Sequence, residues 1–290
     1  MKIAVFMGGV SSEREVSLWT GQAILESLQR QGYDAYGVDV TAENRLSAYT
    51  DNVYDLAYLA FHGEEGEGGR VQSVLDMLGK PYTGSGVIPS AVAMDKALTK
   101  RIARDCGIRV AKSWERLEDV DSWPVVVKPA REGSSVGVYI CADKGEAEKA
   151  VALSGGKKLV IEEFIKGEEL TVGVLNGEAL GVLRIFPKAA ETYDYQSKYA
   201  VGGSVHEFPA KIKKQAYDEA MAASELIHRE LGLSGISRSD FLLKGDELYF
   251  LEVNTCPGMT KTSLVPDLGT LKGYSYDDLV RITVETFGPR

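Results

Sequence analysis

The chain has 290 residues, enough for about two or three domains and for an enzyme with a cleft between them. Its 33 basic and 42 acidic residues give a net charge of −9 without a long basic cluster, which argues against a nucleic-acid-binding surface. Cys106, Cys141 and Cys256 have no paired spacing, which argues against disulfides and a zinc site and favours a reducing, cytoplasmic location. The apolar N-terminal run is too short for a signal peptide or a membrane span, so we expect no membrane association.

The N-terminal third alternates strands and helices. Residues 2–9 predict a buried strand that ends in glycines, and residues 13–31 have the apolar spacing of an amphipathic helix. Further strands are predicted in DAYGVDV, YDLAYLAFHG and KPYTGSG, with a helix over RVQSVLDMLG between the last two. This α/β pattern predicts a small, Rossmann-like parallel-sheet domain over residues 1–93.

The pattern changes after a predicted helix over MDKALTKRIARDCG, which ends at Gly107. Glycine-punctuated strands follow over residues 123–140 and 158–186 and indicate antiparallel sheets. A helix over residues 214–231, two strands and a final helix from about Tyr276 complete the chain.

We therefore expect an α+β region after the N-terminal domain, with a central subdomain at residues 94–172 and a C-terminal subdomain at residues 173–290. The polar segment over residues 187–207 has no clear period, and a loop of that length in a compact protein is a candidate lid.

The two strands ISRSDFLL and ELYFLEVN flank the turn sequence KGDE and carry polar residues at alternate positions. Because strand side chains alternate between faces, Arg238 and Asp240 share one face, as do Glu252 and Asn254. If the loop comprises residues 245–247, Asp240 lies opposite Glu252 and Arg238 lies opposite Asn254. A two-residue loop would shift the register by one and put the two acids on opposite faces.

The four polar side chains of this hairpin indicate a bound cation. We expect apolar neighbours on the same face, namely Ile236, Leu242, Leu248 and Phe250. Two carboxylates in such surroundings repel each other unless positive charge compensates them. Two acids and an amide offer only oxygen ligands, which suit Mg²⁺ with nucleotide phosphates as its remaining ligands. The alternative is a structural Arg-Asp-Glu network on a half-exposed hairpin.

No P-loop and no complete dinucleotide fingerprint occurs, so ATP would have to be held differently. Lys128 lies at the end of an apolar strand. The loop after it is rich in glycine and serine, and the backbone N–H groups of such a loop can approach phosphate. Lys96 on the preceding helix is a second candidate phosphate ligand. Each signal alone is weak, because strand-end lysines and Gly-Ser loops are common at surfaces.

The order of these features resembles the ATP-grasp superfamily, in which two antiparallel sheets hold ATP between them. Seven motifs are similar, in order, to those of the D-alanine–D-alanine ligase family: GGVSSEREVSL, FHGEEGEGG, PYTGSGV, MDK, VVKPAREGSSVGV, YDYQSKY and LEVNTCPGMTKTSLVP. The resemblance covers nearly the whole chain.

This resemblance implies roles for the matching residues. It implies ATP-binding roles for Lys96, Lys128, Glu162, Glu169 and Lys198. It implies that two Mg²⁺ ions, with Mn²⁺ as an alternative, are bound by Asp240, Glu252 and Asn254. It implies contacts to the first D-alanine from Glu13 and His62, and to the second from Ser263 and Leu264. It implies catalytic roles for Glu13 with Ser134 and Tyr199, and for Arg238 with the Gly258 N–H at an oxyanion site.

The family resemblance further implies an ADP-forming ligase that joins two D-alanine molecules for peptidoglycan synthesis. Its partners would be D-alanine and ATP, and it would act as a cytoplasmic homodimer. The pair Lys198-Tyr199 in the lid favours an amine over a hydroxyl acid as second substrate. Two alternatives remain open at this point: another ATP-grasp carboxylate-amine ligase, and a nucleotide-binding regulatory protein without turnover.

Overall fold

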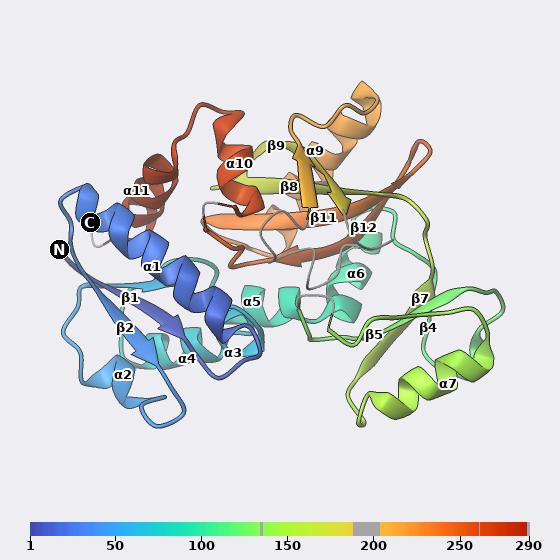
Figure 1. Ribbon diagram of the computed structural model, residues 1–290, viewed down its shortest axis with the longest axis horizontal. Coiled ribbons are helices and arrows are strands. Elements are labelled where there is room, and N and C mark those ends of the chain that lie inside the picture. Colours follow the sequence, from blue (N-terminus) through green and yellow to red (C-terminus); the bar gives the residue numbers. More distant parts are fainter. Residues whose placement is uncertain (134–135, 188–203, 261, 289–290) are drawn as a thin grey trace.

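The computed structural model describes residues 1–133, 136–187, 204–260 and 262–288 (Figure 1). It contains one parallel sheet of three strands and two antiparallel sheets of four and five strands. The predicted fold class is therefore confirmed. Within these ranges, no helix has both the length and the apolar character that a membrane span requires.

The N-terminal sheet has the order β2-β1-β3, with β1 at Lys2–Gly8, β2 at Asp34–Val40 and β3 at Leu56–Leu59. Its central strand is buried on both faces, which explains the continuous apolar run AVFM. The surrounding helices are α1 (Arg14–Arg30), α2 (Ser47–Thr50), α3 (Glu64–Glu67) and α4 (Arg70–Met77). The predicted strand in KPYTGSG is wrong, because Tyr82 forms only an isolated bridge to Ala57.

The four-stranded sheet follows two helices, α5 (Val87–Met94) and α6 (Lys96–Asp105). Its order is β4-β7-β5-β6. The strands are β4 (Ser113–Trp114), β5 (Val125–Pro129), β6 (Tyr139–Cys141) and β7 (Leu159–Glu163), and a short helix η1 (Leu117–Asp119) follows β4. Helix α7 (Lys144–Leu153) closes a small core with this sheet through Ala147 and Ala150.

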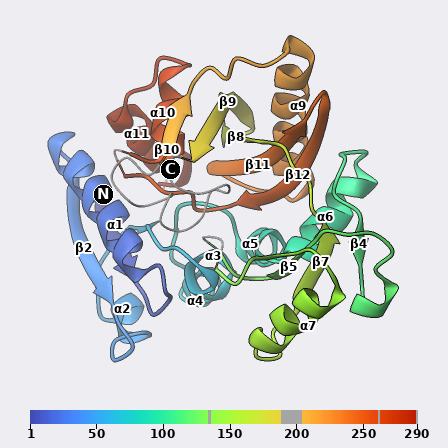
Figure 2. The ribbon, with the colours of Figure 1, turned by 45° about the vertical axis from the view of Figure 1, so that its right-hand side comes forward.

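The five-stranded sheet has the order β10-β9-β8-β11-β12. Its strands are β8 (Glu168–Leu175), β9 (Glu178–Pro187), β10 (Ser204–Glu207), β11 (Ile236–Lys244) and β12 (Glu247–Asn254). Helix α9 (Lys214–Glu230) packs its alanine-rich stripe on one face, and α10 (Leu264–Thr270) packs on the other. Figures 1 and 2 show the smaller antiparallel sheet to one side of this sheet, with α6 between them.

The last helix, α11 (Tyr276–Phe287), returns to the beginning of the chain. Leu279, Val280 and Val284 share one core with Ile3 and Val5 of the N-terminal sheet. Asp277 accepts a hydrogen bond from Ser27 at 2.7 Å and pairs with Arg30 at 2.7 Å, both on α1. The two ends of the chain are therefore held together, and the loops of the N-terminal sheet keep a fixed place beside the five-stranded sheet.

The hairpin of β11 and β12 differs from the expected one and still brings the acids together. Its loop has two residues, because Lys244 pairs with Glu247, so the two-residue alternative is the one found. The expectation that such a loop would put the acids on opposite faces is wrong. A β-bulge between Asp240 and Phe241 shifts the register by one, and Asp240 lies opposite Glu252. The bulge also places Phe250 in the core, against Phe241 at 5.7 Å between ring centroids, and not on the acid face as expected.

The bulge places Phe250 in the core and the next residue, Leu251, at the cavity, and this difference can be tested. We expect Phe250→Ala to lower the free energy of unfolding by about 3 to 5 kcal/mol, because this fully buried ring leaves a cavity in the core. Leu251→Ala, the matched control, should cost only about 1 kcal/mol, because Leu251 is half-buried and lines an open cavity. Urea denaturation of both variants measures this. The reverse order of stabilities would contradict the bulged register.

Candidate active site

A cavity of about 960 Å³ lies where the two antiparallel sheets, α6 and the N-terminal loops meet. Every residue with a predicted site role that the structure describes lines it. These residues are Glu13, His62, Lys96, Lys128, Glu162, Glu169, Arg238, Asp240, Glu252, Asn254, Gly258, Ser263 and Leu264. The other three, Ser134, Lys198 and Tyr199, lie outside the described residues. The cavity is large enough for a nucleotide together with small substrates.

The acidic pair on β11 and β12 is compensated by cations from two elements. Arg238 binds Asp240 in a bidentate manner, with Nε to Oδ1 at 2.9 Å and Nη2 to Oδ2 at 2.7 Å. Thr171 on the neighbouring strand β8 donates to the same carboxylate at 2.6 Å. Glu252 is paired with Lys96 of α6 at 3.1 Å. The strand register thus sets two acids side by side, and each has a cation of its own.

These side chains suit a hard divalent cation by their chemistry. Asp240, Glu252 and Asn254 offer carboxylate and amide oxygens and no sulfur or imidazole. Within the described ranges, no group of three or more His, Cys, Asp or Glu side chains comes together as a metal centre. Three side chains would fill only part of the coordination shell of such an ion, and phosphate oxygens and water are the further ligands that Mg²⁺ ordinarily keeps.

A second charged cluster lies under the cavity. Glu162 of β7 is 2% exposed, and its two carboxylate oxygens pair with the ammonium groups of Lys100 and Lys128. Burial alone raises the pKa of this carboxyl, but the two lysines outweigh it and lower the pKa to about 2. Glu162 is therefore anionic at neutral pH. Lys128 faces the cavity and Lys100 does not.

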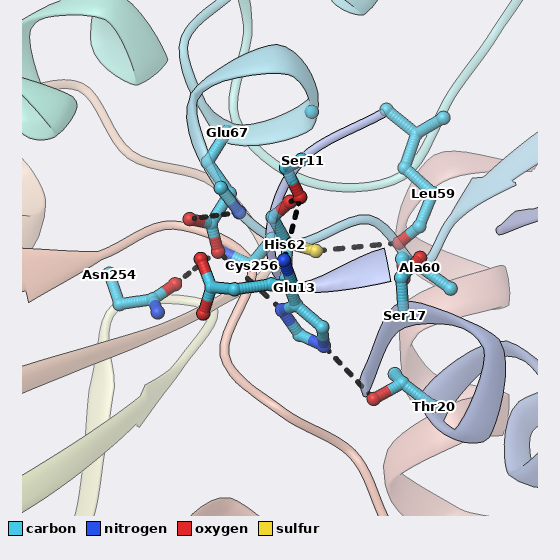
Figure 3. A network of polar contacts seen from close by, with 12 residues as sticks. Ser11, Glu13, Ser17, Thr20, Leu59, Ala60, His62, Glu67, Asn254 and Cys256 are labelled. Carbon is cyan, nitrogen blue, oxygen red and sulfur yellow. Dashed lines mark hydrogen bonds and ion pairs between the residues drawn. The ribbon is translucent and has the colours of Figure 1, made fainter. Parts of the chain in front are cut away.

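The N-terminal loops supply a third polar group, shown in Figure 3. Ser11 donates to the His62 backbone oxygen at 2.8 Å and thereby ties the loop after β1 to the loop after β3. The His62 ring contacts Thr20 Oγ1 at 3.0 Å through Nε2 and Glu67 Oε1 at 3.7 Å through Nδ1. Glu67 is 8% exposed, and burial raises the pKa of its carboxyl.

Glu13 at the start of α1 is buried at 7% exposure and lies against the loop after β5. A Cβ atom at Gly133 would come within 2.9 Å of Glu13 Oε2, so a larger residue there would displace the Glu13 carboxylate. A Cβ at Gly258 would similarly meet Ser263 Oγ at 2.9 Å, and Ser263 Oγ accepts from the Thr260 N–H at 2.9 Å. All four residues of these two close approaches line the cavity.

The sequence analysis missed two charged residues of this region. Lys100 follows Lys96 by four residues on a predicted helix, so the two share one face, and this spacing was the available signal. Glu67 belongs to the motif FHGEEGEGG, but that motif contains three glutamates, and only the structure distinguishes the buried one from Glu64 and Glu65.

Comparison with known proteins decides the family. Residues 101–285 match the family model described as "D-ala D-ala ligase C-terminus". A D-alanine–D-alanine ligase of Fusobacterium nucleatum is 63% identical over 290 residues, which cover 99% of each chain. The chain belongs to the D-alanine–D-alanine ligase family. A ligase of the same name from Citrifermentans bemidjiense is 45% identical over 96% of this chain and 93% of its own.

Solved structures agree with this assignment. The D-alanine–D-alanine ligase of Bacillus anthracis, complexed with ATP, superposes with a TM-score of 0.85 at 32% identity and covers 99% of this chain and 97% of its own. The VanG D-Ala:D-Ser ligase of Enterococcus faecalis has a TM-score of 0.84 at 27% identity and covers 98% of both chains. The ligase family thus includes close structural relatives with different second substrates.

A substitution of Glu252 on β12 can distinguish a ligand role of this residue from a structural role. If Glu252 is a metal ligand, we expect Glu252→Gln to lower turnover by about 100-fold or more, because loss of such a ligand would remove several kcal/mol of transition-state stabilisation. The free energy of unfolding should change by less than about 1 kcal/mol, since the lost ion pair with Lys96 is partly exposed.

Phosphate release and thermal unfolding measure the two effects. A Glu247→Gln variant is the matched control, because this exposed acid on the same strand pairs with Arg109 outside the cavity. Glu252→Gln protein that unfolds readily but keeps full turnover in its folded fraction would favour the structural network.

Proposed function

We propose that the protein joins two D-alanine molecules to D-alanyl-D-alanine with hydrolysis of ATP to ADP and phosphate, for peptidoglycan precursor synthesis. The observation that carries this proposal is the 63% identity to a D-alanine–D-alanine ligase over 99% of both chains. The cavity supports it, because each described residue with an expected role lines that one space.

The first step activates a poor acylating agent. A carboxylate oxygen of the first D-alanine attacks the γ-phosphorus of ATP, and the bond from this phosphorus to the β–γ bridging oxygen breaks. ADP departs, and the first D-alanine is now an acyl phosphate. Lys96 and Lys128 would hold the ATP phosphates, Glu162 and Glu169 would lie on the side of the adenine and ribose, and Lys198 would contact the γ-phosphate. Positioning of the reactants supplies most of the rate enhancement in such a phosphoryl transfer.

Asp240, Glu252 and Asn254 would hold two Mg²⁺ ions, or Mn²⁺ in their place. Such ions, when bound, neutralise negative charge on the phosphates. Lys96 and Arg238 are the cations that contact Glu252 and Asp240 in the present structure. They keep the two acids compensated when no ion is bound.

The second step forms the peptide bond. The amine of the second D-alanine attacks the acyl carbon, phosphate leaves with the electrons of the broken C–O bond, and the amine loses a proton. Arg238 and the Gly258 N–H would stabilise the negative oxygen of the tetrahedral intermediate, where loss of one donor typically costs about 3 to 4 kcal/mol. Asp240 fixes the plane of the Arg238 guanidinium through its bidentate contact.

Both D-alanine subsites are proposed to lie in the same cavity. Glu13 and His62 would receive the first D-alanine, with Ser134 and Tyr199 as partners of Glu13. Ser263 and Leu264 would receive the carboxylate of the second D-alanine. The expected lid over residues 187–207 is too long at its ends, because Pro187 and residues 204–207 pair as strands. The rest of that segment, which lies outside the described residues, would close over the cavity and keep water from the acyl phosphate.

We place the protein in the cytoplasm as a homodimer. Cys106, Cys141 and Cys256 are all free thiols in the structure, which fits a reducing compartment. The homodimer is proposed from the family resemblance. A second candidate for the incoming amine is D-serine, because the VanG D-Ala:D-Ser ligase has nearly the same fold.

The reaction itself is the most direct test. We expect ATP-dependent phosphate release with D-alanine and Mg²⁺, and none with L-alanine or after removal of the metal by a chelator. A coupled phosphate assay measures release, and mass spectrometry of the product distinguishes D-alanyl-D-alanine from D-alanyl-D-serine when both amino acids are supplied. Equal rates with D- and L-alanine would contradict the stereospecific assignment.

A further inference from the structure

Lys100 is a buried cation of the site region that does not reach the cavity. It is 3% exposed, lies on α6 one turn after Lys96, and does not line the cavity. Its ammonium contacts one carboxylate oxygen of Glu162, and Lys128 contacts the other oxygen. Lys100 therefore acts on a ligand only through Glu162 and Lys128.

The three side chains do not balance in charge. Glu162 is anionic, since its pKa is lowered to about 2 despite burial. Burial lowers the pKa of Lys100 to about 8, and the neighbouring Glu162 opposes that effect, so the ammonium is mostly charged at neutral pH. For Lys128, the attraction of Glu162 outweighs burial, and the pKa is raised. One anion thus has two cations, and the cluster has one positive charge in excess.

We propose that Lys100 is a positioning residue that keeps Glu162 compensated while Lys128 turns to the ATP phosphates. This inference rests on the proposed function. Of the two lysines in the cluster, only Lys128 lines the cavity, so it is the cation that a phosphate can draw away. Lys100 stays behind, and the carboxylate remains paired throughout.

The physical reason is the cost of an unpaired charge in a buried place. Without Lys100, Glu162 and Lys128 form a neutral buried pair, and Lys128 cannot move to a phosphate without leaving a buried carboxylate uncompensated. Phosphate and Glu162 would then compete for one ammonium. With Lys100 present, Lys128 exchanges its ion pair with Glu162 for one with phosphate, and Glu162 keeps Lys100 as its partner. The free energy of ATP binding is therefore more favourable than without Lys100.

The test is a double-mutant cycle on ATP binding by the full-length protein. We expect Lys100→Met to raise the Kd for ATP by about tenfold or more, because breaking a buried ion pair is costly. In the Glu162→Gln background, where no anion holds Lys128, the same change should alter the Kd by less than about threefold. Lys100→Gln, which keeps a donor for Glu162 but not the charge, is prepared alongside and should also weaken ATP binding.

Isothermal titration calorimetry gives the Kd values, and steady-state kinetics should show a higher KM for ATP with an unchanged KM for D-alanine. Arg101→Met is the matched control, because this exposed neighbour on α6 pairs only with Glu115 among the described contacts, and it should leave both constants unchanged. Equal losses in both backgrounds, or no loss in the Lys100 variants, would overturn the inference. Failure of the wild-type protein to bind ATP would instead overturn the proposed function.

Discussion

Oppositely charged side chains from separate elements meet around one cavity, and this compensation of charge is the constraint on which the site depends. Lys96 of α6 contacts Glu252 of β12, and Lys128 of β5 contacts Glu162 of β7. A buried carboxylate keeps its charge at low cost where cations and hydrogen-bond donors lie beside it. A triphosphate would attract these same lysines. The cations that stabilise the site without a ligand are therefore the ones that can bind a nucleotide.

The fold brings these charges together through a few local features. The bulge between Asp240 and Phe241 keeps the acids side by side and sends Phe250 into the core. Helix α6 lies in the chain between the strands of the N-terminal sheet and those of the smaller antiparallel sheet, and it supplies lysines to both charged clusters. The contact of α11 with α1 and the N-terminal sheet holds the Glu13 loop beside the cavity.

Sequence patterns predicted the elements whose residues repeat with a clear period, such as α1, β2 and the two strands around Asp240. They did not predict the bulge, because alternation along one strand contains no information about an extra residue on its partner. Lys100 was missed for a similar reason: its neighbour Glu162 is 62 residues away, and only tertiary structure brings the two together. The family motifs, in contrast, named residues that all line the cavity wherever the structure describes them, while their roles stay predictions.

The most direct measurement is a crystal structure of the protein with a non-hydrolysable ATP analogue and Mn²⁺, with data collected at the manganese absorption edge. The account requires anomalous peaks that contact Asp240, Glu252 and Asn254 and that bridge to the analogue's phosphates, with Lys96 and Lys128 on those phosphates. Manganese or nucleotide at another place, with the acids still paired to Arg238 and Lys96, would contradict it.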